Sequence, residues 1–204
     1  MLVSDRRRLS RQPLVELARE AARSGVDWIQ VREKDLADGA LLRVASDVRQ
    51  AVEAAQTKGT APSRVLVNGR PDIAQAAGAH GVQLPEEGLP VAAVRRAFPG
   101  LAIGASCHSI EAARRAEEEG ADWVVLGPVF STPGKEHHPL GLERLAQAVR
   151  ELRVPVYAIG GIDLANAPRA LAAGASGLAA IRLFVDAPPP LGALVRRLKA
   201  GPIA

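Results

Sequence analysis

Three polar side chains alternate along one short apolar run: Gln30, Arg32 and Lys34. Residues two apart on an extended strand point to the same side, so one amide and two cations converge there. Such a set favours an anion, and the planar guanidinium of Arg32 matches the paired oxygens of a phosphate or carboxylate. A ladder of ion pairs with Glu33 or Asp35 is the alternative, but Glu33 points to the opposite side of the strand.

A glycine pair predicts a second anion site. Gly160 and Gly161 end an apolar run, and a later strand-like run ends at Ala180 and Ile181. Glycines leave backbone N–H groups open to a ligand, and a helix that starts near Asp163 adds the positive end of its dipole. In (β/α)8 barrels, the loops after the last two strands bind phosphate in this way. The pattern therefore predicts a phosphate site formed by Gly160, Gly161, Ala180 and Ile181.

Short apolar runs alternate with amphipathic segments from one end of the chain to the other. We predict strands at residues 2–3, 26–32, 64–67, 81–84, 102–105, 123–127, 154–160 and 177–181. We predict helices at residues 13–24, 39–56, 71–77, 91–97, 109–119, 142–151, 164–173 and 190–199. This alternation, without an early Gly-x-Gly-x-x-Gly, favours a closed barrel over an open doubly wound sheet. We therefore expect an α/β fold, a single (β/α)8 TIM barrel that forms one domain over residues 1–204.

The composition fits one soluble domain that binds a small molecule. The chain has 204 residues, 48% of them hydrophobic, and a formal net charge of +4. Its cations are spread among acidic residues and only 3% of its residues are aromatic, which argues against nucleic-acid binding. The single cysteine, Cys107, excludes an internal disulfide, and no apolar run is long enough to span a membrane. We expect a cytoplasmic protein without nucleic-acid or membrane partners, and a homo-oligomer is left open.

Several segments follow one another in order along nearly the whole chain. They are Gln30-Val31-Arg32-Glu33-Lys34, Val67-Asn68, Gly81-Val82-Gln83-Leu84, Gly104-Ala105-Ser106-Cys107-His108-Ser109, Gly120-Ala121-Asp122, Gly127-Pro128-Val129-Phe130 and Ala158-Ile159-Gly160-Gly161-Ile162. Together they resemble the thiamine phosphate synthase/TenI superfamily, whose members are (β/α)8 barrels that handle a thiazole phosphate. The resemblance implies one of two reactions. The synthase joins the thiazole phosphate to a hydroxymethylpyrimidine diphosphate and releases pyrophosphate, whereas the TenI-type tautomerase aromatises a thiazole carboxylate phosphate.

Two glycines depart from the synthase pattern. In the synthase, aspartates at the positions of Gly69 and Gly88 bind the magnesium that carries the diphosphate, so the resemblance implies a lost metal site here. Without the metal, the pyrophosphate leaving group loses roughly several kcal/mol of charge stabilisation. Asp72, Glu86 and Glu87 are alternative metal ligands, but we favour their assignment as solvated loop or first-turn charges.

One proline departs from the tautomerase pattern. The resemblance implies that TenI-type tautomerases share an acid–base histidine at the position of Pro128. Histidine titrates near neutral pH, so other histidines at the mouth are candidates for proton transfer, with a structural or exposed histidine as the alternative. His108 follows a predicted strand, and Lys135 and His138 lie in a long loop whose composition suggests a lid. The resemblance assigns the loop lysine to the anionic part of the substrate.

Three further residues complete the predicted substrate site. The resemblance implies that Ser106 contacts the ligand, and Asn68 belongs to its motif after the third predicted strand. Arg70 carries a guanidinium that either binds a substrate carboxylate through two hydrogen bonds or pairs with Asp72. The sequence leaves these two alternatives for Arg70 open.

We therefore predict a TenI-like thiazole tautomerase, an isomerase that needs no cofactor. The glycine pair and the turn after the last strand hold the phosphate of its thiazole ligand. Arg32, Lys34 and Arg70 hold the anionic or carboxylate end, and His108 or a loop histidine moves the proton. Two alternatives remain: a thiamine phosphate synthase that uses magnesium, and a non-catalytic regulatory module that binds a thiazole phosphate or thiamine phosphate.

Overall fold

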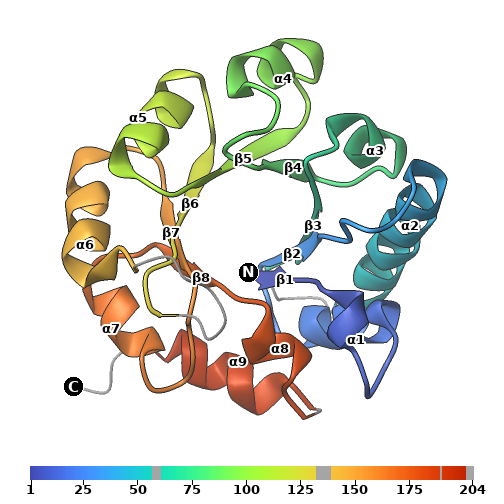
Figure 1. Ribbon diagram of the computed structural model, residues 1–204. Coiled ribbons are helices and arrows are strands. Elements are labelled where there is room, and N and C mark those ends of the chain that lie inside the picture. Colours follow the sequence, from blue (N-terminus) through green and yellow to red (C-terminus); the bar gives the residue numbers. More distant parts are fainter. Residues whose placement is uncertain (57–60, 132–138, 189, 201–204) are drawn as a thin grey trace.

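Eight parallel strands form one closed ring, and the helices surround it (Figure 1). The computed structural model describes residues 1–56, 61–131, 139–188 and 190–200. Neighbouring strands pair in chain order, and a parallel bridge between Leu2 and Ala180 joins the first strand to the last. At this closure the N–H of Val3 donates to the carbonyl of Ala180 at 2.9 Å. The predicted (β/α)8 TIM barrel is confirmed.

The elements alternate as the sequence pattern predicts. The strands are β1 (Leu2–Val3), β2 (Trp28–Val31), β3 (Arg64–Asn68), β4 (Gly81–Leu84), β5 (Ala102–Cys107), β6 (Trp123–Leu126), β7 (Val156–Ile159) and β8 (Gly177–Ala179). The helices are the 3-10 turn η1 (Arg6–Arg8), α1 (Leu14–Arg23), α2 (Asp38–Ala55), α3 (Pro71–Ala76), α4 (Val91–Ala97), α5 (Ile110–Glu118), α6 (Gly141–Glu151), α7 (Ala167–Ala172), α8 (Arg182–Val185) and α9 (Gly192–Lys199). The sequence analysis misses η1 and α8 because both are too short to show a helical period. Among the described helices, none is long and apolar enough to cross a bilayer.

Helix α7 begins later than the sequence pattern predicts, at Ala167. Oδ1 of Asp163 accepts hydrogen bonds from the N–H groups of Ala165 and Asn166, both at 2.8 Å. In return, Oδ1 of Asn166 accepts from the N–H of Asp163 at 2.9 Å. This reciprocal pattern is a capping box, and the carbonyl of Asp163 also accepts from the N–H of Ala167 at 2.9 Å, four residues further on. The assigned helix starts at Ala167 because Pro168 has no N–H to continue the pattern, and the turn that begins at Asp163 agrees with the prediction of a helix start near this residue.

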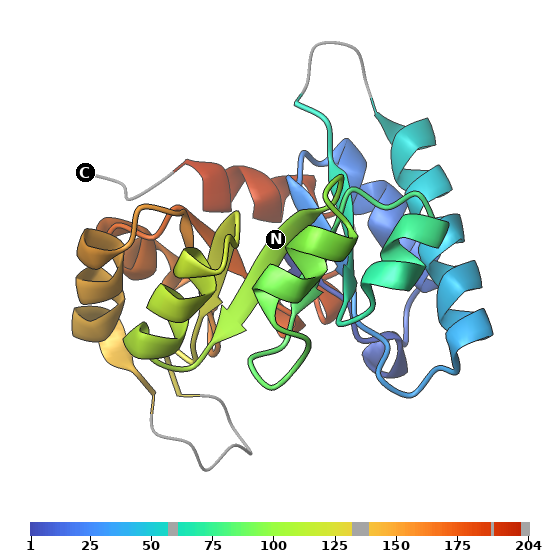
Figure 2. The same cartoon turned by 90° about the horizontal axis from the view of Figure 1, so that it is seen from above.

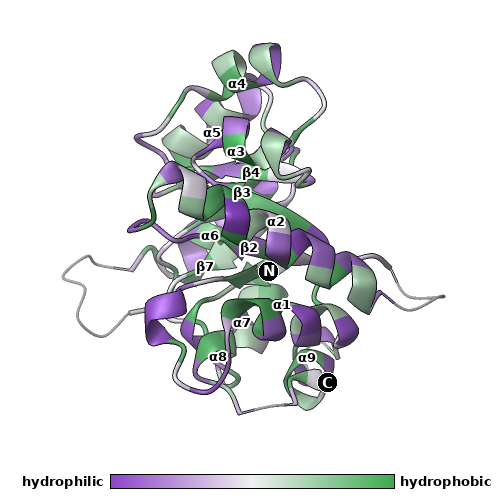
Figure 3. Cartoon of the chain, turned by 90° about the vertical axis from the view of Figure 1, so that its right-hand side faces the viewer, coloured by the Kyte–Doolittle hydropathy of each residue, from purple (hydrophilic) through white to green (hydrophobic). Residues whose placement is uncertain are grey.

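Two cores follow from the alternation of side chains along the strands. One lies between the strands and the surrounding helices and includes Ile29, Val82 and Leu145. The other fills the ring and includes Leu66 and Val125. Figure 3 shows the strands as mostly hydrophobic, whereas the helices carry both hydrophobic and hydrophilic residues. Each helix therefore covers the ring with its apolar side.

Aromatic side chains fill the end of the ring where the strands begin. Trp28 and Trp123, the first residues of β2 and β6, stack with ring centroids 5.0 Å apart. Gly104 leaves room for this packing, since a Cβ there would collide with the indole of Trp123 and the amide of Gln83. The open end is the one toward which the arrowhead of β5 points, at the lower edge of Figure 2. In (β/α)8 barrels this carboxyl end of the strands carries the active site.

His80 makes a pH-sensitive contact near the start of β4, away from that end. Its Nδ1 accepts a hydrogen bond from the N–H of Val65 at 3.1 Å, and burial, with help from nearby Arg64, lowers its pKa below the usual 6.5. As the pH falls below about 6.5, the unfolded chain therefore binds more protons than the folded chain, and stability decreases. In the His80→Asn variant, whose side-chain oxygen keeps an acceptor, we expect this decrease to be smaller.

Urea unfolding of both proteins at about pH 7.5 and about pH 5.5 measures this difference. The comparison uses the change between the two pH values within each protein, so a general cost of the substitution cancels. An equal loss of stability in wild type and variant would show that His80 does not contribute to the pH dependence.

Candidate active site at the carboxyl end of the barrel

A layer of polar side chains crosses the inside of the ring on consecutive strands. Gln30 on β2 donates through Nε2 to Oδ1 of Asn68 on β3 at 3.0 Å. Gln83 on β4 donates through Nε2 to the hydroxyl of Ser106 on β5 at 3.0 Å, and its Oε1 accepts from the indole N–H of Trp123 at 3.1 Å. The two glutamines are only 4% and 1% exposed, so their amides are held in place by these contacts. We call these five residues the polar layer.

The polar layer contains three predicted site residues and two that the sequence analysis does not assign to the site. Gln30, Asn68 and Ser106 lie together as predicted, and Asn68 and Ser106 stand near the open ends of their strands. Gln83 and Trp123 are missed. The signal for Gln83 is an amide within the otherwise apolar run of β4, in a strand buried throughout. Such a residue needs a polar partner inside the protein.

Glu33 anchors the segment after β1 to the end of β2. Its Oε1 accepts from the hydroxyl of Ser4, and its two carboxylate oxygens accept from the N–H of Arg6 at 3.0 and 3.1 Å. Burial raises the pKa of Glu33, although the hydrogen bond from Ser4 acts in the opposite direction. The Ser4 hydroxyl also accepts from the N–H of Arg32 at 2.9 Å. These contacts fix the backbone from which the predicted anion-binding side chains project.

Arg32 and Lys34 have no carboxylate within ion-pair distance in the part of the chain that the structure describes. Glu33 points away from them toward Ser4, and Asp35 pairs with Arg6 at 2.6 Å. The predicted ladder of ion pairs along this segment is therefore absent from the described contacts. Both cations remain available for an anion at the mouth.

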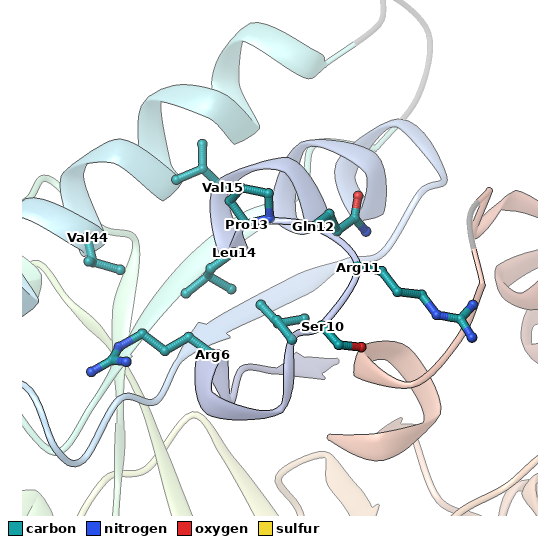
Figure 4. Close-up of a pocket in the computed structure, with 9 residues that line it drawn as sticks. Arg6, Ser10, Arg11, Gln12, Pro13, Leu14, Val15 and Val44 are labelled. Carbon is teal, nitrogen blue, oxygen red and sulfur yellow. The ribbon is translucent and has the colours of Figure 1, made fainter.

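An open crevice of about 560 Å³ lies beside the mouth and is lined by residues 6, 9–15 and 44 (Figure 4). Leu14 and Val15 face it from α1, and Val44 faces it from α2. Arg6 and Arg11 point to opposite sides in this view, with Ser10 between them. None of the polar layer lines the crevice, so it is separate from the predicted site.

Arg70 is engaged by two carboxylates. Its Nε and Nη2 donate to the two oxygens of Asp72 at 2.9 and 2.7 Å, and its Nη1 pairs with Asp38. Hydrogen bonds from Arg70 lower the pKa of Asp72. Asp38 is the first residue of α2 and Asp72 lies in the first turn of α3, so the cluster ties two helices together at the rim. Of the two alternatives for Arg70, the structure shows the pairing with Asp72, and the predicted hold on a substrate carboxylate lacks support.

The glycine pair has the backbone geometry that only glycine adopts readily. Gly160 and Gly161 have φ angles of 95° and 64°. A Cβ on Gly160 would lie 2.5 Å from the Cα of Pro128, and the carbonyl of Gly160 accepts from the N–H of Phe130 at 3.0 Å. Among the described residues, the N–H groups of both glycines have no acceptor. These N–H groups are therefore open to a ligand, and phosphate binding by them stays a prediction.

The turn after β8 holds the two further residues predicted to bind phosphate, Ala180 and Ile181. The N–H of Ala180 donates to the carbonyl of Met1 at 3.1 Å, because this residue takes part in closing the ring. The predicted role of Ala180 as a backbone donor to phosphate is therefore corrected. The N–H of Ile181 has no acceptor in the described chain, and Ile181 directly precedes the short helix α8. A short extra helix after the last strand is a usual part of barrel phosphate sites.

His108 is held by a carboxylate at the rim. Oε2 of Glu86 accepts from the backbone N–H of His108 at 2.6 Å and lies 2.8 Å from its Nδ1. The imidazole is 68% exposed, so its Nε2 side is reachable from solvent. The other predicted catalytic residues, Lys135 and His138, lie outside the described residues. Next to His108, burial raises the pKa of the Cys107 thiol to about 12, which makes it an inert packing residue.

The described residues do not fit the magnesium site that the resemblance implies. The two aspartate positions are Gly69 and Gly88, and the nearby carboxylates of Asp72 and Glu86 already accept hydrogen bonds from Arg70 and His108. No cluster of three histidine, cysteine or acidic residues with metal-site geometry occurs in the described part of the chain. Magnesium is usually held by one or two protein carboxylates together with substrate phosphates, and the two positions that supply them in the synthase pattern carry none here.

Comparison with known proteins assigns the chain to one family. The family model described as thiamine monophosphate synthase (TMP-TENI) matches residues 1–184. A thiamine-phosphate synthase of Methanocella arvoryzae is 41% identical over 188 residues, which cover 91% of this chain and 85% of the relative. Another of Methanoculleus marisnigri is 43% identical over 173 residues, covering 83% of this chain and 79% of the relative. A solved thiamine phosphate pyrophosphorylase from Pyrococcus furiosus superposes with a TM-score of 0.85 at 34% identity, covering 98% and 92% of the two chains.

These findings confirm the resemblance to the superfamily and correct the predicted reaction. The family model does not distinguish the TenI branch. The prediction of a TenI-like tautomerase, an isomerase, is wrong, because relatives that cover most of the chain are named thiamine-phosphate synthases. The prediction failed because glycines at positions 69 and 88 remove two metal-binding carboxylates, and the loss of metal ligands does not by itself exclude the synthase reaction.

Proposed function

Because the chain belongs to the thiamine monophosphate synthase family, we propose that it is a thiamine-phosphate synthase. It joins a thiazole phosphate to a hydroxymethylpyrimidine diphosphate and releases pyrophosphate. The observation that carries this proposal is the 41% identity with a named thiamine-phosphate synthase over 91% of the chain. The site described above supports it because it offers cationic side chains and open backbone N–H groups, which two anionic substrates require.

Two anion-binding segments stand at separate places on the ring, one for each substrate. The free N–H groups of Gly160, Gly161 and Ile181 form a cradle for the single phosphate of the thiazole. Arg32 and Lys34, at the end of β2, hold the diphosphate of the pyrimidine. The polar layer lies inside the ring, where its amides and hydroxyl bind the polar edge of a heterocycle.

The reaction forms one bond and breaks one. The lone pair of the thiazole nitrogen attacks the methylene carbon of the pyrimidine, and the bond between that carbon and the diphosphate oxygen breaks. The electron pair leaves with the oxygen, so negative charge grows on pyrophosphate. Cations already in place at the end of β2 stabilise this charge without reorganising, which lowers the barrier. The cradle and the polar layer hold the two rings in line for the attack.

Product formation tests the proposal directly. The purified chain is incubated with thiazole phosphate and hydroxymethylpyrimidine diphosphate, and thiamine phosphate is measured by chromatography. Parallel reactions contain either magnesium or a chelator, so the result does not depend on a metal requirement. We expect product only when both substrates are present.

A different outcome has a clear meaning. If the chain binds thiazole phosphate in a thermal-shift assay but forms no product in either reaction, it is a non-catalytic binding module and the proposed function is wrong. Reactions that lack one substrate are the controls for contaminating product.

A further inference from the structure

We infer that this chain neutralises the diphosphate of its substrate with its own side-chain cations and needs no divalent metal. The inference rests on the proposed function, because it concerns how the same site holds one of the two substrates. It is based on three kinds of residue that lie near one another at the carboxyl end of the barrel. Glycines replace the metal-binding carboxylates, the nearby carboxylates of Asp38, Asp72 and Glu86 already have partners, and two cations have none among the described residues.

The first step concerns the end of β3, where the metal would bind. Gly69 follows Asn68, has a φ of 68°, and donates its N–H to the carbonyl of Gln83 at 2.9 Å. The nearest atoms to a Cβ at this position are ring carbons of Pro85 at 3.6 Å. The backbone is therefore built in a conformation that aspartate and asparagine also tolerate, with room for a side chain that this chain lacks.

The second step concerns the carboxylates that surround this position. Asp38 and Asp72 hold the guanidinium of Arg70, and Glu86 holds the backbone and ring of His108. A cation that recruited Asp72 or Glu86 would have to break contacts of 2.6 to 2.9 Å. Asp72 is 55% and Glu86 31% exposed, so solvent screens these contacts and each costs little to break. They still compete with a metal ion for the same carboxylate oxygens.

The third step concerns the cations. Arg32 and Lys34 together bring two positive charges, the same charge that one magnesium ion brings. The backbone of Arg32 is fixed through the hydroxyl of Ser4, which is itself held by the buried carboxylate of Glu33. A guanidinium positioned in this way binds two phosphate oxygens at once, and an ammonium adds a second point charge. The leaving pyrophosphate is then stabilised by protein groups alone.

Binding of inorganic pyrophosphate tests this inference apart from the reaction. Isothermal titration calorimetry of the intact chain is run with a chelator and then with magnesium. We expect binding in the chelator, with an affinity that magnesium improves by less than about threefold. Binding that appears only with magnesium, or tightens about tenfold or more with it, would overturn the inference.

Two sets of variants locate the effect. We expect Arg32→Gln to weaken pyrophosphate binding in the chelator by about tenfold, and Lys34→Gln to weaken it by several-fold. Arg153→Gln removes the same charge from an exposed residue between α6 and β7, at the opposite end of the barrel, and is expected to change nothing. Equal binding by Arg32→Gln and Arg153→Gln would show that the cations at the end of β2 do not hold the anion.

Gly69→Asp reinstates one carboxylate of the family pattern in a position with room for it. We expect it to weaken pyrophosphate binding in the chelator and to make binding improve with magnesium. Gly69→Asn has the same shape and the same tolerance for positive φ but no charge, so it is the matched control. If the aspartate and asparagine variants respond identically to magnesium, Gly69 does not determine the metal requirement and the inference fails.

Failure of this inference and failure of the proposed function give different results. Thiamine phosphate formed only with magnesium would support the function and overturn metal independence. Pyrophosphate binding in the chelator without any product would support the cationic site and overturn the function. Product formed equally in chelator and magnesium would support both.

Discussion

In the Gly161→Ala variant, affinity for thiazole phosphate is expected to fall by about a hundredfold. Gly161 has a φ of 64°, and an alanine there carries a cost of roughly 1–2 kcal/mol from the backbone alone. Its Cβ would also collide with the carbonyl of Ser131 and lie 2.8 Å from the Cβ of Phe130. The backbone must shift to relieve these contacts, and the N–H groups that form the phosphate cradle shift with it.

Calorimetric titration with thiazole phosphate measures this effect, and circular dichroism shows whether the barrel is retained. Gly100→Ala is the matched control, since a Cβ at Gly100 meets no atom within 4 Å and its φ is not in the left-handed region. A folded Gly161→Ala protein with wild-type affinity would show that the glycine pair serves packing against the segment after β6 and does not form the phosphate site.

Replacing Gln83 by methionine is expected to lower the free energy of unfolding by roughly 2–4 kcal/mol. The side chain is 1% exposed and joins the hydroxyl of Ser106 to the indole N–H of Trp123. Methionine has a similar length but replaces neither hydrogen bond. The indole N–H and the hydroxyl are then left without their partner inside the ring, and each unpaired buried group costs about 1–3 kcal/mol.

Urea unfolding followed by tryptophan fluorescence measures the loss, because Trp123 reports on its own surroundings. Gln50→Met makes the same exchange at an exposed position on α2 and is expected to shift stability by less than about 0.5 kcal/mol. If Gln83→Met were as stable as Gln50→Met, the polar layer would not support the barrel, and its amides would serve the ligand alone.

The ring of strands was predictable because its signals are local. Each apolar run in a parallel barrel is buried on both sides, and the runs are separated by amphipathic helices whose period differs. The strand at Gly81–Leu84 was predicted with its observed bounds. The four-residue α8 was not, since it is too short to carry a period. The assigned start of α7 was also predicted too early, because Pro168 lacks the N–H that would continue the helical bonds of the turn capped by Asp163.

The sequence predicts the direction of a side chain where it follows from alternation along a strand. It does not predict contacts with residues far away in the chain. Alternation correctly sends Glu33 to the other side of the strand from Arg32. It does not show that the hydroxyl of Ser4, 29 positions away, lies there and donates a hydrogen bond to that carboxylate. The contact between Gln83 and Trp123 spans 40 positions and exists only because the ring brings β4 and β6 together around Gly104. The sequence also could not distinguish the two alternatives for Arg70, because its pairing with Asp72 depends on side-chain conformation.

The bridge between Leu2 and Ala180 also bears on how the molecule is assembled. It joins residues from the first and last strands, so forming it requires the chain to close its longest loop in the sheet. Closing this loop lowers the entropy of the chain before the new contacts stabilise it, so the bridge is expected to form late in folding. Before that step, the cations that follow β2 and the glycine pair that follows β7 are connected only through the strands β3 to β6. The two proposed anion-binding segments therefore reach their final positions only when the bridge between Leu2 and Ala180 closes the ring.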